Sequence, residues 1–400
     1  MKIIWVKAGG LVPLDSGGKI RSFHIAKELA KSHEVTLFTF YVGDSSDEHE
    51  KLTSVFAKVV THPLTVSTGR GIAETFRYLA TFLASLPYSI TKYCRPEVAH
   101  HLEEVLAGER YHVILCDFVN AAGVIPFGIG IPVVIFTHNV EATIWKRHWE
   151  VATNPVWKYA FKREYERMRT AELGYLRRAT HVLTVSDTDT TSLRRDLGAA
   201  KITTIPTGVD VDYFRPVGGE EADSLVFTGS MDWMPNEDGI LHFVEHVLPL
   251  IRKKRPNVKL CVAGRNPGNK IKALSDRDAC IEVTGRVGDI RKYIAKGSVF
   301  VVPLRVGSGT RLKIFEAMAM GKAVVSTTIG AEGLPVTSGA HIILADEPNE
   351  FAASVCRLLA SREERARIGN TARRLMEEKY SWEEVAKSVE SVLRSVSSSD

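Results

Sequence analysis

Short runs of β-branched and other apolar residues alternate with longer amphipathic segments from one end of the chain to the other. This alternation predicts parallel strands joined by helices, and near-continuous apolar strands are expected where helices cover both faces of a sheet. The pattern therefore predicts an α/β protein with two doubly wound parallel sheets in succession. The predicted strands are KIIWVKA, EVTLFTF, HVILCDF, PVVIFTH and HVLTVS in the first half, and SLVFTGS, VKLCVAG, IEVTG, VFVVPL, AVVSTT and HIILA in the second.

The boundary between the two sheets is expected where a strand gives way to Pro, Gly and acidic residues, in ITTIPTGVDVDYFRPVGGEEADS. We place the linker at residues 206–223, so that the predicted domains are residues 1–205 and 206–380. The amphipathic segment SWEEVAKSVESVL predicts a last helix over residues 381–396. The polar tail that follows this helix is expected to fray.

Composition excludes several classes of protein. With 44% hydrophobic and 25% charged residues among 400, the chain is neither disordered nor collagen-like, and a net charge of +5 is too weak to indicate a nucleic-acid partner. Five separated cysteines predict reduced thiols in a cytoplasmic protein, and without a Cys/His cluster no metal site or other cofactor is expected. The N-terminus does not resemble a signal peptide, and no apolar run approaches the ~18–20 residues of a membrane span.

Two segments of the first half interrupt the alternation. Residues 68–90 carry aromatic and aliphatic residues at helical spacing, and residues 143–178 mix aromatic residues with many Lys and Arg. A basic aromatic helix can lie on an anionic membrane surface, which would make the protein peripheral at the inner face of the membrane. The pattern favours the alternative, a long helix that packs its aromatic stripe on its own domain, and leaves the membrane contact open.

The most informative stretch is VVPLRVGSGTRLKIFEAMAMGKAVVSTTIGAEGL, residues 301–334. A strand is expected to end at Pro303, and a helix to open after a glycine loop and run to Met320, where Gly321 stops it. Such a helix start exposes backbone N–H groups at the positive end of the helix dipole, and glycines let phosphates approach the main chain. The loop is therefore a candidate phosphate site formed by Gly307, Ser308, Gly309 and Thr310.

Three charged residues follow this loop. Arg311 and Lys313 stand in the first turn of the helix, where cations oppose the dipole and cost stability unless an anion neutralises them. We expect them to hold a diphosphate; the alternative is solvated charges, or Lys313 paired with Glu316. Glu316 lies one and a half turns into the helix, where its carboxylate can accept both hydroxyls of a ribose.

These motifs in combination resemble the retaining glycosyltransferases of family 4, which have the GT-B fold of two facing Rossmann-like domains. The resemblance runs along most of the chain. Segments such as GSMDWMPN are similar to those of bacterial transferases that act on exopolysaccharide or other surface glycans. It implies that the last predicted helix packs back on the first domain. The motifs that carry it are DSGGKIRSFHIAKELAKSHEVTLFT, THN, VLTVSD, IPTGVDVDYFRP, LVFTG and FEAMAMGKAVVST.

By this resemblance Glu316 is the second glutamate of the family's E-x7-E motif and binds the ribose. The first glutamate would fall at Ser308, so the donor sugar would be contacted by backbone N–H groups of the glycine loop or by another side chain. The family commonly has an Arg and a Lys after the first strand of the second domain. Ser230 and Asn236 stand in their approximate places, which leaves the positive charge to residues of the 311–313 turn.

Other candidates follow strand ends of the second domain. The resemblance places Arg286 and Val287 in the loop that holds the nucleotide base. Gly264 and Arg265 also end a strand, and there we expect a solvated loop.

The first domain offers two further groups of candidates. Gly17 and Gly18 form a predicted loop before a helix over residues 20–31, and the resemblance turns this loop toward the donor phosphates; the alternative is a tight turn without a ligand. Arg21 follows on that helix and is expected either to reach an anionic acceptor or to be an ordinary surface residue.

His138 ends a predicted parallel strand, at the sheet edge where ligands bind. The resemblance makes it the active-site histidine that contacts the donor sugar, with Asn139 and Glu141 as candidates for orienting sugar or acceptor.

The implied activity is metal-independent transfer of a sugar from a nucleotide diphosphate sugar to a glycan, lipid-linked or small-molecule acceptor, with retention of anomeric configuration. Two alternatives stay open: a GT-B epimerase acting on a UDP-sugar, and a catalytically silent nucleotide-sugar-binding protein, which Ser308 and the missing Arg/Lys pair would suit. A nicotinamide dehydrogenase is not indicated, because neither glycine loop reads G-x-G-x-x-G with an acidic residue about 20 positions later.

Overall fold

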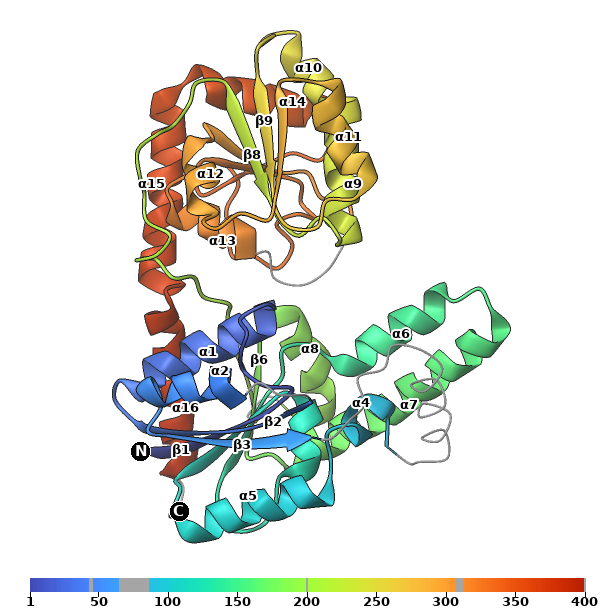
Figure 1. Cartoon of the computed structure of the whole chain (residues 1–400), viewed down its shortest axis with the longest axis vertical. Helices are drawn as coiled ribbons and strands as arrows, with labels where there is room; N and C mark the ends of the chain where they lie inside the picture. The colour runs from blue at the N-terminus through green and yellow to red at the C-terminus, as the bar shows by residue number, and fades with distance from the viewer. Residues whose placement is uncertain (43–45, 65–85, 199–200, 307–311, 399–400) are drawn as a thin grey trace. The chain divides into compact units, whose positions relative to one another are not determined.

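The computed structural model describes residues 1–42, 46–64, 86–198, 201–306 and 312–398. The chain divides into two compact units, which we call the N-terminal unit (Met1–Pro206 with Val385–Asp400) and the C-terminal unit (Thr207–Glu384). Figure 1 shows each unit as a sheet covered by helices.

The N-terminal unit is built on a seven-stranded sheet in the order β3-β2-β1-β4-β5-β6-β7, and every neighbouring pair is parallel. The order reverses between β1 and β4, which is the doubly wound pattern, and the inner strands are almost wholly buried. The five strands predicted here are confirmed. The strands are β1 (Lys2–Ala8), β2 (Glu34–Val42), β3 (Lys58–Leu64), β4 (Val113–Asp117), β5 (Val133–Phe136), β6 (His181–Thr184) and β7 (Ile202–Thr204).

Strand β3 is missing from the predicted strands. Its sequence, KVVTHPL, contains Pro63, and a proline argues against a strand because it lacks the N–H that a ladder needs. The structure places β3 at the edge of the sheet, paired only with β2 among the described strands, where a proline is tolerated.

Helices of the N-terminal unit cover the sheet with apolar stripes. In α5, for example, Val98, Leu102 and Leu106 recur at a spacing of four and are buried. The predicted helical segment 68–90 lies mostly outside the described residues. The helices are α1 (Gly17–Ala30), α2 (Ser46–Glu50), α4 (Tyr88–Thr91), α5 (Pro96–Gly108), α6 (Glu141–Val151), α7 (Pro155–Arg178) and α8 (Asp187–Leu197), with 3₁₀ turns at Lys51–Ser54 and Val119–Val124.

The basic aromatic segment forms two helices, α6 and α7, and the single long helix that we considered is wrong. The break has a local cause, because Pro155 stands at the first position of α7 and cannot continue α6. Asn154 caps the new helix, and its Oδ1 accepts hydrogen bonds from the N–H groups of Val156 at 2.9 Å and Trp157 at 3.4 Å. The two helices pack against each other as a hairpin (Figure 1).

The C-terminal unit has a six-stranded sheet in the order β10-β9-β8-β11-β12-β13, again with parallel neighbours. All six strands predicted in the second half are confirmed. They are β8 (Ser224–Thr228), β9 (Lys259–Ala263), β10 (Ile281–Gly285), β11 (Val299–Val302), β12 (Val324–Ser326) and β13 (Ile343–Leu344). The helices are α9 (Met234–His242), α10 (Leu248–Arg252), α11 (Asn269–Arg277), α12 (Arg291–Lys296), α13 (Leu312–Ala319), α14 (Pro348–Ala360) and α15 (Arg362–Lys379), with a π-helical turn at Phe243–Val247.

The last helix, α16 (Trp382–Ser397), begins in the C-terminal unit and continues into the N-terminal unit. Its start is fixed by an isolated bridge in which the Val209 N–H donates to Tyr380 O at 2.7 Å. Farther along, Glu390 Oε1 lies 3.0 Å from His33 Nε2 of the N-terminal unit. No helix in the described part of the chain is long and apolar enough to cross a membrane.

Candidate functional site

The carboxyl ends of β8 and β9 meet in close main-chain contact. Gly229 follows β8 with a φ of +156°, and a Cβ built on Gly264, after β9, would lie 1.7 Å from the Gly229 carbonyl oxygen. Only glycine fits at position 264, because any side chain would overlap that carbonyl. In a parallel sheet this edge is where ligands bind, so the close main-chain contact lies at the end of the sheet where a site is expected.

Lys313, in the first turn of α13, reaches back to this edge. Its Nζ donates a hydrogen bond to Asn236 Oδ1 at 2.7 Å and lies 4.1 Å from the centre of the Phe227 ring. A Cβ on Gly229 would lie 2.6 Å from the same Nζ, which puts the ammonium group directly against the main chain after β8. A cation therefore lies beside the end of the first strand of this unit, although the residues that follow this strand in the sequence include the uncharged Ser230 and Asn236.

Asn236 links this lysine to the loop after β8. Its side chain is buried, and Nδ2 donates to the Ser230 carbonyl oxygen at 2.7 Å. The amide nitrogen of Asn236 thus binds the loop after β8, and its amide oxygen orients the Lys313 ammonium group. The structure brings Lys313 to Ser230 and Asn236, the two residues that stand where the family commonly has an Arg and a Lys.

A second cation at the same edge is Arg265, which we expected in a solvated loop. It is exposed, but its Nε donates to Ser230 Oγ at 2.8 Å. The Ser230 hydroxyl in turn donates to Asp232, whose other carboxylate oxygen accepts from Asn266 Nδ2 at 2.8 Å. These hydrogen bonds from Ser230 and Asn266 lower the pKa of Asp232. Only the strand order, which sets β9 beside β8, reveals that Arg265 shares a site with Ser230.

Glu316 stands on the same helix as Lys313 and is partly buried. Burial raises the pKa of its carboxyl to about 7, although the Lys313 charge acts in the opposite direction. A carboxyl poised near neutral pH can accept hydrogen bonds from two vicinal hydroxyls when ionised. The predicted stop of this helix is confirmed, since α13 ends at Ala319 and Gly321 adopts a φ of +68°.

The remaining candidates of the C-terminal unit fall into two sets. The candidate phosphate loop, Gly307 to Thr310, and Arg311 lie outside the described residues. Arg286 and Val287 follow β10 at the edge of the sheet, two strands away from β8, and Arg286 is exposed.

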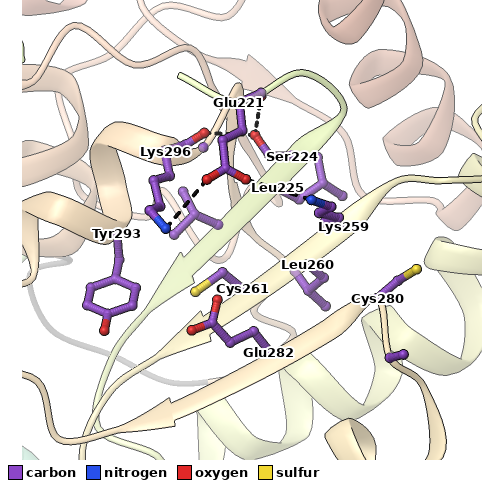
Figure 2. Close-up of a pocket in the computed structure, with 13 residues that line it drawn as sticks. Glu221, Ser224, Leu225, Lys259, Leu260, Cys261, Cys280, Glu282, Tyr293 and Lys296 are labelled. Carbon is purple, nitrogen blue, oxygen red and sulfur yellow. Dashed lines mark hydrogen bonds and ion pairs between the residues drawn. The ribbon is translucent and has the colours of Figure 1, made fainter. Parts of the chain in front are cut away.

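A cavity of about 220 Å³ lies at the opposite end of the same strands. Figure 2 shows its lining, with Glu221 placed between two lysines: its carboxylate is 3.4 Å from Lys296 Nζ and 3.9 Å from Lys259 Nζ. The first residues of β8 and β9 form one wall. No predicted site residue lines this cavity, and it faces away from the strand ends at which α/β proteins bind ligands.

In the N-terminal unit, charged side chains are buried where β1 and β4 end. Lys7 of β1 donates from Nζ to Asp117 Oδ2 of β4 at 3.0 Å, and the same oxygen accepts from Trp5 Nε1 at 2.9 Å. The side chain of Lys7 is 3% exposed and that of Asp117 is fully buried. Neither residue was among the predicted site residues, although a lysine and an aspartate within the apolar runs KIIWVKA and HVILCDF are a visible signal of a buried charged pair.

His138 belongs to the same network. Its Nε2 lies 2.9 Å from Asp117 Oδ1, and its Nδ1 lies 3.1 Å from a guanidinium nitrogen of Arg21. Because a guanidinium can only donate, Nδ1 must be the acceptor, so Nε2 carries the proton and faces the carboxylate. Both ring nitrogens therefore face protein groups, and Arg21 turns inward, away from the surface where it would meet an acceptor.

Burial and charge set the protonation of this network. Burial lowers the pKa of His138 to about 4, with Asp117 opposing and Arg21 reinforcing the effect. Burial also lowers the pKa of Arg21 to about 10, against the raising effect of Asp117. For Asp117 itself burial acts to raise the pKa, but Lys7 and His138 outweigh it and hold that pKa well below its ordinary range. Near neutral pH, His138 is therefore uncharged beside an ionised Asp117.

Gly17 and Gly18 are the first two residues of helix α1, so the predicted loop at these positions is wrong by about one turn. Ser16 takes the extended cap position instead, which lets the helix start at the first glycine. A Cβ on Gly18 would lie 2.9 Å from the Phe118 ring and 3.7 Å from His138 Nδ1. The small residue lets the start of α1 approach Phe118, which stacks on the His138 ring with centroids 4.1 Å apart.

Asn139 is exposed and Glu141 begins helix α6. Burial raises the pKa of Glu141, and a hydrogen bond from Asn139 opposes that effect. The N–H groups of Glu141 and Ala142 donate to the two carboxylate oxygens of Glu172 at 2.9 and 3.1 Å. Glu172 thus holds the start of α6 beside the strand end that carries His138, an arrangement that the sequence analysis did not anticipate.

Within the described ranges, no group of three or more His, Cys, Asp and Glu side chains is arranged to hold a metal ion.

Two sequence models of known families match the chain. The model described as Glycosyltransferase Family 4 matches residues 16–213, and the model described as Glycosyl transferases group 1 matches residues 222–361. One curated relative is the MMP alpha-(1->4)-mannosyltransferase of Mycolicibacterium hassiacum, which is 25% identical over 394 residues, covering 91% of this chain and 90% of the relative.

Solved structures show the same architecture. The sucrose-phosphate synthase of Thermosynechococcus elongatus superposes with a TM-score of 0.70 at 19% identity over the whole of both chains. The Anabaena protein HepE, solved in complex with UDP, superposes with a TM-score of 0.69 at 15% identity over 99% of this chain and all of HepE. At these identities the likeness establishes the fold.

Proposed function

The chain belongs to the family 4 glycosyltransferases and has the GT-B fold, and from that premise we propose that it moves a sugar from a nucleotide diphosphate sugar to a hydroxyl acceptor with retention of anomeric configuration. Both family models concern sugar transfer, and together they cover most of the chain. The HepE structures with UDP and with UDP-glucose support a nucleotide sugar as the donor. The acceptor that the resemblance suggests is a glycan or a lipid-linked sugar.

The observation that carries the proposal is the position of Lys313 against the main chain of Gly229. Transfer of the sugar leaves a nucleoside diphosphate, so negative charge develops at the phosphates as the glycosidic bond breaks. The Lys313 ammonium, oriented by Asn236, supplies positive charge at the strand edge where the phosphates would lie. Arg265 supplies a second cation at the same edge, held by Ser230.

We assign the ribose to Glu316, on the same helix as the phosphate-binding lysine. The carboxyl lies one turn beyond Lys313, and its partial burial strengthens any hydrogen bond that it makes to a ligand hydroxyl. The two cations and the positive end of α13 support a reaction in which the diphosphate leaves without a metal ion. Metal independence is tested by assaying transfer in the presence of a chelator.

Buried groups of the N-terminal unit fix the predicted active-site histidine in place. Arg21 and Asp117 fix the orientation of the His138 ring, and that ring with Phe118 supports the start of α1 at Gly18. We therefore propose that Arg21 is a positioning residue. A direct contact between His138 and the donor sugar, and roles for Asn139 and Glu141 in orienting the acceptor, stay predictions.

The proposed donor site is tested by titrating UDP, GDP, ADP and dTDP into the full chain and into two variants. Lys313→Met removes the cation at the β8 edge, and Lys272→Met, which changes an exposed lysine of α11, is the matched control. A hydrogen bond to a charged group contributes about 1.5–3 kcal/mol, so Lys313→Met should weaken binding of the preferred nucleotide by about ten- to a hundredfold. Equal affinities for the two variants would overturn the assignment.

A further inference from the structure

The α6–α7 hairpin carries a concentration of exposed apolar side chains around its turn. The exposed fractions are 74% for Val151, 75% for Val156, 49% for Trp157 and 64% for Tyr159. Figure 1 shows the two helices running out from the sheet of the N-terminal unit, with the turn that joins them at the far end. We call residues 151–159 the hairpin tip.

Two pairs of aromatic side chains join the helices of the hairpin. Between the two helices, the Trp145 and Phe161 ring centroids lie 6.2 Å apart, and those of Trp149 and Tyr165 lie 6.0 Å apart. The aromatic residues of this segment therefore fall into two sets. One set joins α6 to α7. The other lies at the tip, where Trp157 stacks on Phe161 with ring centroids 5.8 Å apart and still keeps about half of its surface exposed, an exposure of apolar surface that a monomeric soluble protein normally avoids.

Basic residues surround the hairpin tip. Between residues 144 and 163 there are five basic side chains and one acidic side chain, Glu150. Two lysines of the hairpin lie near glutamates one turn away, Lys146 at 3.7 Å from Glu150 and Lys162 at 3.9 Å from Glu166. Extending the count to residue 166 adds Glu164 and Glu166, and the segment then keeps a net charge of +2, so the region is mildly basic. The five basic residues are Lys146, Arg147, Lys158, Lys162 and Arg163.

We propose that the hairpin tip docks on an anionic phospholipid surface. The tip is a convex turn between two helices, which offers little flat area to a folded partner but can enter the boundary between headgroups and acyl chains. Trp and Tyr favour that boundary because their rings are apolar and their N–H and O–H groups are polar. The basic residues behind the tip would then lie at the level of the lipid phosphates.

The test is co-sedimentation of the full chain with vesicles of phosphatidylcholine alone and with vesicles containing about one third phosphatidylglycerol. We expect binding to the anionic vesicles that falls as salt concentration rises. Lys158→Glu should weaken it roughly fivefold or more. This substitution leaves the helix intact, because an acidic residue in the first turn suits the helix dipole.

Two further variants test whether the apolar side chains of the tip contribute to vesicle binding in addition to the basic residues. The double variant Val156→Ser/Trp157→Ser should weaken binding at least about tenfold. The control Ile129→Ser/Val217→Ser, which alters residues that are each 47% exposed elsewhere on the chain, should bind as the unaltered protein does. Thermal unfolding of each variant checks that it is folded.

Insertion itself is read from tryptophan fluorescence with brominated acyl chains. Vesicle binding should quench the wild-type emission, and Trp157→Phe should lose most of that quenching while still binding. Equal binding to neutral and anionic vesicles, or unchanged binding by the tip variants, would overturn the proposal. So would a dimer in light scattering that Val156→Ser/Trp157→Ser dissociates, with no vesicle binding, because the tip would then join two copies of the chain.

Discussion

The ion pair between Lys7 and Asp117 gives the sharpest test of the buried charge network in the N-terminal unit. Replacing Asp117 by Asn keeps the shape and one acceptor oxygen but removes the negative charge. Lys7, with a side chain only 3% exposed, is then left without the charge 3.0 Å away that offsets its burial. Breaking a buried pair from one side costs about 3–5 kcal/mol, so we expect Asp117→Asn to lower the free energy of unfolding of this unit by that amount.

The measurement is urea denaturation followed by circular dichroism, with hydrogen exchange to assign the loss to the N-terminal unit. Glu109→Gln is the matched control, because it breaks a pair with Lys2 in the same unit whose side chains are about one third exposed. It should lower the free energy of unfolding far less than Asp117→Asn does, because solvent screens an exposed pair. Lys7→Met/Asp117→Asn should cost less than the sum of its two single changes. Additive effects, or a loss no larger than that of Glu109→Gln, would refute the role given to the buried pair.

Two further predictions concern the C-terminal unit. Gly264→Ala should destabilise this unit by several kcal/mol and abolish nucleotide binding, because its Cβ would overlap the Gly229 carbonyl oxygen. Calorimetric unfolding measures the loss of stability and nucleotide titration the loss of binding. A stable variant that still binds nucleotide would contradict the close contact between Gly264 and Gly229. Burial raises the pKa of Glu316 from the ordinary 4.5 to about 7, so its contribution to stability is complete below pH 4.5 and is lost as pH rises through 7. Glu316→Gln should therefore reduce the change of the unfolding midpoint with pH between these values. A pH dependence equal to that of the unaltered chain would show that Glu316 does not titrate in this range.

The fold could be predicted from sequence because its strands are buried on both faces. Near-continuous apolar runs identify such strands without any knowledge of their neighbours, and all eleven predicted runs form strands. Strand β3 was not predicted, because an edge strand is only partly buried and lacks a continuous apolar run, and because an edge position tolerates Pro63. The break of the basic aromatic segment was readable at Asn154 and Pro155, a cap followed by a helix-starting proline.

The site was harder to predict, because its contacts join residues far apart in the chain. Motif position singled out Lys313 and Asn236 as candidates, but their hydrogen bond spans 77 positions and depends on how α13 returns to β8. Arg265 reaches the same edge only because β9 pairs with β8. The inward turn of Arg21 follows from the burial of His138 and Asp117, which no local pattern around position 21 reveals.

The proposed sugar transfer is tested by the release of nucleoside diphosphate from UDP-, GDP-, ADP- and dTDP-sugars, compared between the unaltered chain and Lys313→Met. We expect one donor to be hydrolysed slowly without an acceptor, and Lys313→Met to lower that rate by about ten- to a hundredfold while Lys272→Met leaves it unchanged. Binding of a nucleotide sugar with no release, conversion of the donor to an isomeric nucleotide sugar, or equal rates in Lys313→Met and the unaltered chain would contradict the account.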